Sequence, residues 1–91
     1  MTIEISAVIA TYQRASLLAG ALDALAAQKV PSSIKWEIIV VDNNSQDHTA
    51  DVVEAFANRS AIQVSYVFEP TQGLSRARNR GIKEARGSII A

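Results

Sequence analysis

Apolar residues recur along this chain in two alternating spacings, and the alternation predicts strands and helices in turn. Runs rich in Ile and Val are typical of strands, and they fall at residues 3–10, 36–41, 62–68 and 88–91. Between them, apolar residues recur at helical spacing, in residues 16–28, 49–57 and 74–86. Strands that alternate with helices form parallel sheets through right-handed crossovers, so the pattern predicts a layered α/β fold.

The helical stretches are each expected to bury one face. In the first, the shared stripe consists of Leu17, Leu18, Ala21, Leu22 and Leu25. In the second it consists of Val52, Val53 and Phe56, and Ser45 or Asp47 is placed to cap that helix. Trp36, at the start of a strand, is expected in the core or at its rim.

The most informative junction follows the second strand, where Asp42 comes directly after residues 38–41, Ile-Ile-Val-Val. An unbroken apolar run suits a strand that is covered on both faces. Ligands of open α/β sheets bind beyond the carboxyl ends of the strands, so a carboxylate here is placed to contact a ligand. The alternative is that Asp42 only stabilises a turn or caps a helix.

The loops after the first three strands, residues 11–14, 42–47 and 69–73, are expected to converge on this edge. An aromatic ring and a carboxylate on adjacent loops suit a planar heterocycle, because the ring stacks on it and the carboxylate accepts an N–H. Tyr12 is the ring in question. Its alternative role is to cover the edge of the sheet.

Arg78 stands apart from the other cations of the third helix. With Leu74 set at zero and about 100° per residue, Gly81, Ile82 and Ala85 define an apolar stripe centred near 20°. Arg78 falls at about 40°, inside that stripe, whereas Arg76, Arg80 and Lys83 face solvent. A buried arginine needs a partner, and the expected partner is a phosphate or, alternatively, Asp42 or Glu69 in an internal salt bridge. Asn79 borders the stripe and is within reach of a loop or a ligand.

Composition narrows the function. The chain has 91 residues, 48% of them apolar, a formal net charge of +0 and no Cys. One small domain is expected, without a disulfide or thiolate metal site and without a surface for nucleic acid. No signal peptide and no run as long as a membrane span is visible. His48 lacks partners for a metal site, and neither a dinucleotide fingerprint nor a P-loop is present.

Three segments together resemble the inverting family 2 glycosyltransferases, which have the GT-A fold. They are Ser6–Arg14 (SAVIATYQR), Glu37–Thr49 (EIIVVDNNSQDHT) and Gly73–Ile82 (GLSRARNRGI). The resemblance covers nearly the whole chain and implies a Rossmann-like three-layer α/β/α sandwich with a mostly parallel, incomplete sheet. Residues 1–91 would then be the N-terminal, nucleotide-sugar-binding part of a longer catalytic domain.

The resemblance also implies a site. Thr11 and Tyr12 would line the base of a nucleotide-sugar donor, commonly uracil, and Asp42 would accept a hydrogen bond from it. Arg78 and Asn79 would lie beside the donor. The full set of expected nucleotide-binding residues is Ala10, Thr11, Tyr12, Arg14, Asp42, Asn44, Arg78 and Asn79. Two departures concern the loop: the family often has proline at the position of Ala10 and asparagine at that of Gln13.

A larger departure is an absence. The family has an Asp-x-Asp motif just after the fourth strand, where it holds Mg²⁺ or Mn²⁺ against the donor diphosphate, and a catalytic carboxylate further on. This sequence reaches Ala91 without either. The 91 residues alone are therefore expected to be inactive, and no catalytic or metal-binding residue is assigned in them.

In the complete enzyme the resemblance implies transfer of a sugar, with inversion, from a nucleotide-diphosphate sugar, UDP-sugar first, to a saccharide or lipid-linked acceptor. A cytoplasmic place, at or near the membrane face, is expected. Two alternatives remain at this point: a non-catalytic binding or assembly module on the same scaffold, and a receiver-like signalling domain with Asp42 as phosphoacceptor. The receiver reading lacks the acidic cluster that it needs after the first strand.

Overall fold

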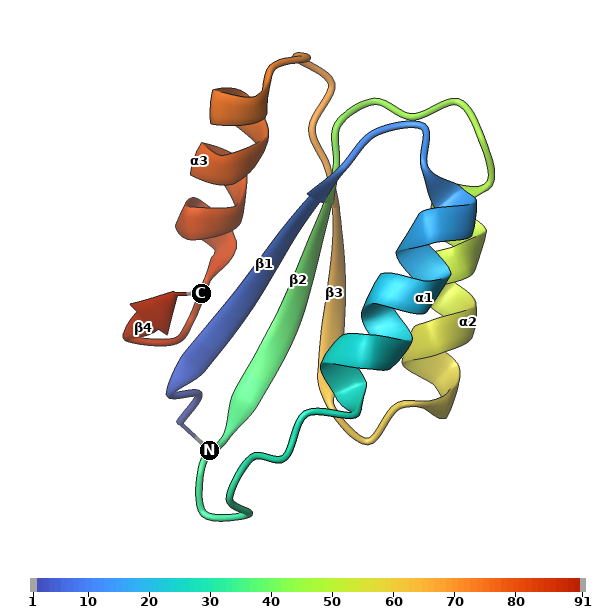
Figure 1. Cartoon of the computed structure of the whole chain (residues 1–91). Coiled ribbons are helices and arrows are strands. Elements are labelled where there is room, and N and C mark those ends of the chain that lie inside the picture. Colours follow the sequence, from blue (N-terminus) through green and yellow to red (C-terminus); the bar gives the residue numbers. More distant parts are fainter. Residues whose placement is uncertain (1, 91) are drawn as a thin grey trace.

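The computed structural model describes residues 2–90, which form a sheet with helices on both faces (Figure 1). The elements are β1 (Ile5–Thr11), α1 (Ala15–Ala26), β2 (Trp36–Asp42), α2 (Thr49–Arg59), β3 (Gln63–Phe68), α3 (Leu74–Glu84) and β4 (Ile89–Ile90). The predicted order of strands and helices is thus confirmed over these residues, with ends that differ by at most two residues.

The four strands are parallel and lie in the order β3-β2-β1-β4. β1 and β2 are the central strands, paired from Ile5 and Trp36 to Thr11 and Asp42. α1 and α2 pack together on one face, and α3 covers the other (Figure 1). Because the strands are parallel, the loops after β1, β2 and β3 all lie at the carboxyl edge of the sheet.

β2 supplies the core of both faces because its side chains alternate. Ile38 and Val40 pack against α1 and α2, in a cluster with Leu18, Leu22, Val53 and Phe56. Ile39 and Val41 pack on the opposite side, against Ala77. Trp36 is partly buried at the rim of the first cluster, as expected.

α3 sits differently from the prediction. Its buried residues are Ala77 and Gly81, whereas Leu74 and Ile82 are 63% and 53% exposed. The helix lies so close to β1 that a Cβ on Gly81 would come within 2.3 Å of the Val8 side chain. Close approach through small residues rotates the buried stripe by about 60° from the position that the apolar pattern predicted. The prediction that Arg78 lies within the buried stripe is therefore wrong, and its side chain is exposed.

Other local predictions also need correction. Leu17 and Ala21, both assigned to the buried stripe of α1, are exposed, Leu17 by 67%. α3 ends at Glu84 rather than Arg86, because the main chain and side chain of Arg86 bind Glu37. The last residue of the predicted fourth strand lies outside the described residues.

The N-cap residue of α2 is His48, which makes no side-chain cap hydrogen bond, and of the two predicted residues only Asp47 bonds the start of the helix. Asp47 accepts hydrogen bonds from the Thr49 N–H, at 3.2 Å, and from the Thr49 hydroxyl. These hydrogen bonds hold the pKa of Asp47 below its usual value. Ser45 instead accepts a hydrogen bond from the Gln13 N–H.

Candidate functional site

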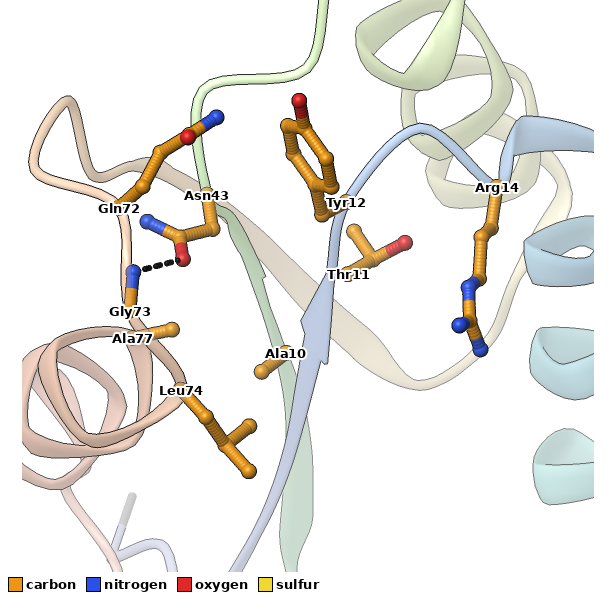
Figure 2. A pocket seen from close by; sticks show the side chains of 9 residues that line it. All are labelled: Ala10, Thr11, Tyr12, Arg14, Asn43, Gln72, Gly73, Leu74 and Ala77. Carbon is orange, nitrogen blue, oxygen red and sulfur yellow. Dashed lines mark hydrogen bonds between the residues drawn. The ribbon is translucent and has the colours of Figure 1, made fainter.

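A pocket of about 550 Å³ opens at the carboxyl edge of the sheet, between the end of β1 and the start of α3. Its lining comes from three loops and α3: Ala10, Thr11, Tyr12, Arg14, Asn43, Gln72, Gly73, Leu74 and Ala77 (Figure 2). The three loops that were expected to converge do so here. In the view of Figure 2, Arg14 and Leu74 lie on opposite sides of β1.

Asn43 holds the third loop against the second. Its Nδ2 donates to the carbonyl of Glu69 at 3.2 Å and to that of Thr71 at 2.9 Å. Its Oδ1 accepts from the Gly73 N–H at 2.9 Å, the bond that is dashed in Figure 2. Both amide protons are thus used, and one lone pair of Oδ1 stays free. The side chain fixes the junction where the third loop becomes α3, and the residue is buried.

The first two loops are joined by a second set of hydrogen bonds. The Gln13 N–H donates to Ser45 Oγ at 2.8 Å, and the Gln46 N–H donates to Gln13 Oε1. Gln13 and Asn44 both have positive φ, 52° and 67°, the left-handed conformation of tight turns. Gln13, at a position where the family often has asparagine, therefore closes the loop through its own side chain.

Asp42 does not line the pocket, because alternation along β2 places its side chain on the face of Ile38 and Val40. It is 2% exposed. One carboxylate oxygen accepts the Ser45 N–H at 2.8 Å, and the other accepts the Tyr66 hydroxyl at 2.5 Å. Burial and the hydrogen bond to Asp42 raise the pKa of Tyr66. The geometry is that of a turn-stabilising residue, the alternative that the sequence left open, and a carboxylate bonded in this way is poorly placed as a phosphoacceptor.

Tyr12 projects at the mouth of the pocket. The residue is 48% exposed, so its ring is accessible to a ligand. Ala10 and Ala77 line the interior with small side chains, which leaves room for a flat group beside the ring. An aromatic ring over a shallow, partly apolar pocket is suited to stacking.

Arg78 lies next to this pocket, in an adjoining hollow of about 340 Å³. The two share Ala10 and Leu74 as a common wall. Among residues 2–90 no salt bridge of Arg78 is found. The internal salt bridge that was the alternative is not formed, because Glu69 pairs with Arg80 at 3.3 Å and Asp42 binds Tyr66 and Ser45.

Arg80 is consequently not the free, solvated cation that the helical wheel predicted. It pairs with Glu69 and, at 3.7 Å, with Glu84. The Thr71 N–H and Arg80 together lower the pKa of Glu69. Asn79 lies on this side of α3, in a separate hollow with Arg76 and Lys83.

Of the eight residues nominated from the sequence, four line the pocket: Ala10, Thr11, Tyr12 and Arg14. Asp42, Asn44, Arg78 and Asn79 do not, and their role in nucleotide binding stays a prediction. The nomination omitted Asn43, Gln72, Gly73, Leu74 and Ala77. A signal for Asn43 existed, since alternation along β2 sends the residue after Asp42 to the face of Ile39 and Val41, where α3 lies.

Residues 2–90 contain no cluster of three His, Cys, Asp or Glu side chains that could hold a metal ion. Within the same residues, no helix is long and apolar enough to span a bilayer.

Comparison with known proteins shows the family of this chain. The family model described as glycosyl transferase family 2 matches residues 6–91. The chain belongs to this family. Among curated relatives, the glycosyltransferase AglE of Haloferax volcanii is 34% identical over 87 residues, which cover 96% of this chain and 28% of the relative. The poly(ribitol-phosphate) β-N-acetylglucosaminyltransferase TarS of Staphylococcus aureus is 31% identical over 85 residues, covering 93% and 15%.

Solved structures of glycosyltransferases superpose on the chain. The mannosyltransferase PcManGT of Pyrobaculum calidifontis, in complex with GDP-Man and Mn²⁺, has a TM-score of 0.87 at 28% identity, covering 99% of this chain and 26% of its own. TarS 1-349 in complex with UDP-GlcNAc has a TM-score of 0.84 at 28% identity, covering 97% and 25%. The fold is therefore of the GT-A type, and the chain spans about a quarter of the length of these structures.

Proposed function

We propose that these residues form the donor-binding half of an inverting glycosyltransferase, which transfers a sugar from a nucleotide-diphosphate sugar to an acceptor hydroxyl. The observation that carries the proposal is the pocket at the carboxyl edge, with an exposed aromatic residue at its mouth and, beside it, an arginine that makes no salt bridge within residues 2–90. Family membership, and the GDP-Man and UDP-GlcNAc complexes of similar structures, support a nucleotide-sugar as the ligand.

The proposed pose follows the walls of the pocket. The base stacks on Tyr12, with the free lone pair of Asn43 and the Gln72 amide as hydrogen-bonding groups within the same lining. The diphosphate lies toward Arg78, across the shared wall of Ala10 and Leu74, near the N-terminus of α3. The guanidinium fork and the helix dipole both favour an anion there. Of the other nominated residues, Thr11 and Arg14 border the base, and Asp42 and Asn44 shape the turn after β2. Asn79 lies outside this pose, in the separate hollow with Arg76.

A divalent metal is part of the proposal for the complete enzyme, since a similar structure holds Mn²⁺ with its donor. The described residues do not offer a carboxylate set that fits such an ion. We therefore place its ligands, and the base that deprotonates the acceptor, outside this sequence, and derive no step through them. The chain alone would bind donor without transferring it. A UDP-sugar donor, a saccharide or lipid-linked acceptor and a place at the cytoplasmic membrane face remain parts of the proposal.

Calorimetry on the full-length protein with UDP and GDP tests the donor site. Tyr12→Ala is expected to weaken binding of the preferred nucleotide about 5- to 150-fold, the range for loss of one aromatic–base stack. Arg78→Ala is expected to weaken the diphosphate much more than the corresponding nucleoside. Arg76→Ala is the matched control, because it removes the same charge from the other side of α3. If Tyr12→Ala and Arg78→Ala each bind UDP and GDP as tightly as wild type does, the proposed site is contradicted.

A further inference from the structure

A buried carboxylate lies on the same face of the sheet as α3, toward the other end of the strands. Glu37 follows the first residue of β2 and is 1% exposed. Burial of an ionised carboxylate costs free energy unless hydrogen bonds or charges replace its water. The proposed donor site makes no use of this group, since the pocket is formed by the loops at the carboxyl edge.

The partners of Glu37 come from β1 and from the turn after α3. Oε2 accepts from Ser6 Oγ at 2.6 Å and from the Arg86 N–H at 2.9 Å. Oε1 accepts from Arg86 Nε at 3.1 Å and Nη2 at 3.0 Å. Burial raises the pKa of Glu37, but the hydrogen bonds from Ser6 and Arg86 outweigh burial, so its pKa lies below the usual value.

The turn is held against β1 by a second contact. Ser6 Oγ accepts the Gly87 N–H at 2.8 Å. A Cβ on Gly87 would lie 2.7 Å from the Ser6 nitrogen and 2.8 Å from the Ile5 carbonyl carbon, so only glycine fits. Four residues, Ser6, Glu37, Arg86 and Gly87, thus form one connected group, which we call the Glu37 clamp.

β4, which follows the Glu37 clamp, has little packing of its own. Within residues 2–90 it pairs with β1 at two positions, Ile5 with Ile89 and Ser6 with Ile90. Ile89 and Ile90 are 59% and 43% exposed. A buried face normally sets the register of a strand, because a slip of one residue moves the apolar side chains to the other face. That constraint is weak here, because both apolar side chains of β4 are exposed. The register of β4 therefore depends on the polar contacts of the preceding turn.

We propose that Glu37 is a positioning residue whose carboxylate sets the register of β4 against β1. The carboxylate fixes Arg86 through its main chain and its guanidinium together, and Ser6 fixes Gly87 in the next step along the chain. In a longer protein, a segment that continues from β4 would be directed by the same contacts. If the proposed function is right, this is the segment that brings the metal ligands to the donor diphosphate, and that consequence alone rests on the proposed function.

Amide hydrogen exchange in the full-length protein tests the Glu37 clamp. Glu37→Gln keeps the shape of the side chain but replaces one acceptor oxygen with a donor group that faces Arg86. Exchange at Gly87 and Ile89 is expected to become about tenfold faster, whereas Val8 and Val40 in the central strands keep their rates. Glu54→Gln, an exposed change of the same kind on α2, is the control and should alter none of them.

A gentler pair of variants covers the case in which Glu37→Gln does not fold. Ser6→Ala removes the acceptor of the Gly87 N–H and one donor to Glu37. Ser65→Ala changes the same residue type on β3, where the side chain makes no hydrogen bond within residues 2–90. Faster exchange at Gly87 in Ser6→Ala but not in Ser65→Ala supports the proposal. Unchanged rates at Gly87 and Ile89, or equal acceleration at all four amides, overturns it, because the latter indicates only a general loss of stability.

Metal-dependent nucleotide binding separates this inference from the proposed function. In Glu37→Gln, affinity for UDP or GDP without metal is expected to stay unchanged, and the gain on adding Mn²⁺ to shrink about tenfold. If wild-type protein binds neither nucleotide, the proposed function fails while the exchange rates still decide the role of Glu37. Glu37→Gln could also show faster exchange at Ile89 while Mn²⁺ still raises its nucleotide affinity as much as in wild type. That result would contradict the idea that the Glu37 clamp also directs the segment after β4.

Discussion

The two faces of the sheet are built on different principles. On the face covered by α1 and α2, large apolar side chains interlock, with Leu22, Ile38 and Val40 fully buried and Phe56 3% exposed. On the face covered by α3, the helix approaches through Ala77 and Gly81. Its larger apolar residue Leu74 stays exposed beside the pocket.

Polar contacts replace apolar bulk on the α3 face. Asn43 joins the loop to α3 at one end of the helix, and the Glu37 clamp holds the turn at the other end. One face thus stabilises the domain by burial, whereas the other positions a helix and leaves room for a ligand. The difference implies that stability and binding can be changed separately, one face at a time.

The largest difference in stability between the two faces is expected from Phe56→Ala compared with Leu74→Ala. Phe56→Ala removes a buried ring from the α1/α2 face and is expected to lower the free energy of unfolding by about 3–5 kcal/mol. Leu74→Ala shortens a side chain that is 63% exposed, and the expected loss is within about 0.5 kcal/mol. Chemical denaturation measures both. Nucleotide affinity should respond in the opposite order, and a stability loss in Leu74→Ala as large as that in Phe56→Ala contradicts the comparison.

Asn43→Asp tests the polar side of the comparison. The variant keeps size and shape, but a carboxylate cannot donate to the carbonyls of Glu69 and Thr71, and it brings negative charge against both. Leaving two hydrogen bonds unmade is expected to cost about 1–3 kcal/mol and to release the loop that carries Gln72 and Gly73. Faster amide exchange at Gly73, with weaker nucleotide binding, is the expected result. Asn58→Asp, on the exposed surface of α2, is the matched control, and a Gly73 rate equal to that of wild type counts against the bracing role.

The α1/α2 face is the part of the fold that the apolar pattern predicted well. Leu18, Leu22, Val53 and Phe56 recur at helical spacing and are all buried. The unbroken run in β2 correctly indicated a strand covered on both faces, and the convergence of three loops at its carboxyl end followed from parallel topology alone.

The α3 face was harder to predict because its packing depends on the absence of side chains. The helical wheel counted Gly81 in the stripe, but Leu74, Ile82 and Ala85 drew the centre of that stripe toward themselves. Close approach to β1 depends instead on Gly81, which has no side chain. Arg78 was accordingly placed in the core and is instead exposed, in the hollow that adjoins the pocket. Asp42 drew attention as a carboxylate, yet the neighbouring amide of Asn43 lines the pocket, since alternation decides which of the two faces α3.

Gly81→Ala addresses this point directly, with an expected effect no larger than that of Asn43→Asp. The added methyl would lie 2.3 Å from Val8 Cγ1 and 3.3 Å from Val41 Cγ2, so overpacking is expected to lower the free energy of unfolding by about 1–3 kcal/mol. Gly20→Ala is the matched control on α1. A Cβ there meets nothing within 4 Å, and removing glycine from a helix interior is expected to stabilise by about 0.5–1 kcal/mol. If close approach is the cause, adding Val8→Ala to Gly81→Ala relieves the clash, and the double variant is less destabilised than the two single variants combined, by at least about 0.5 kcal/mol. Strict additivity in that cycle contradicts the view that α3 is seated on β1 through the missing side chain of Gly81.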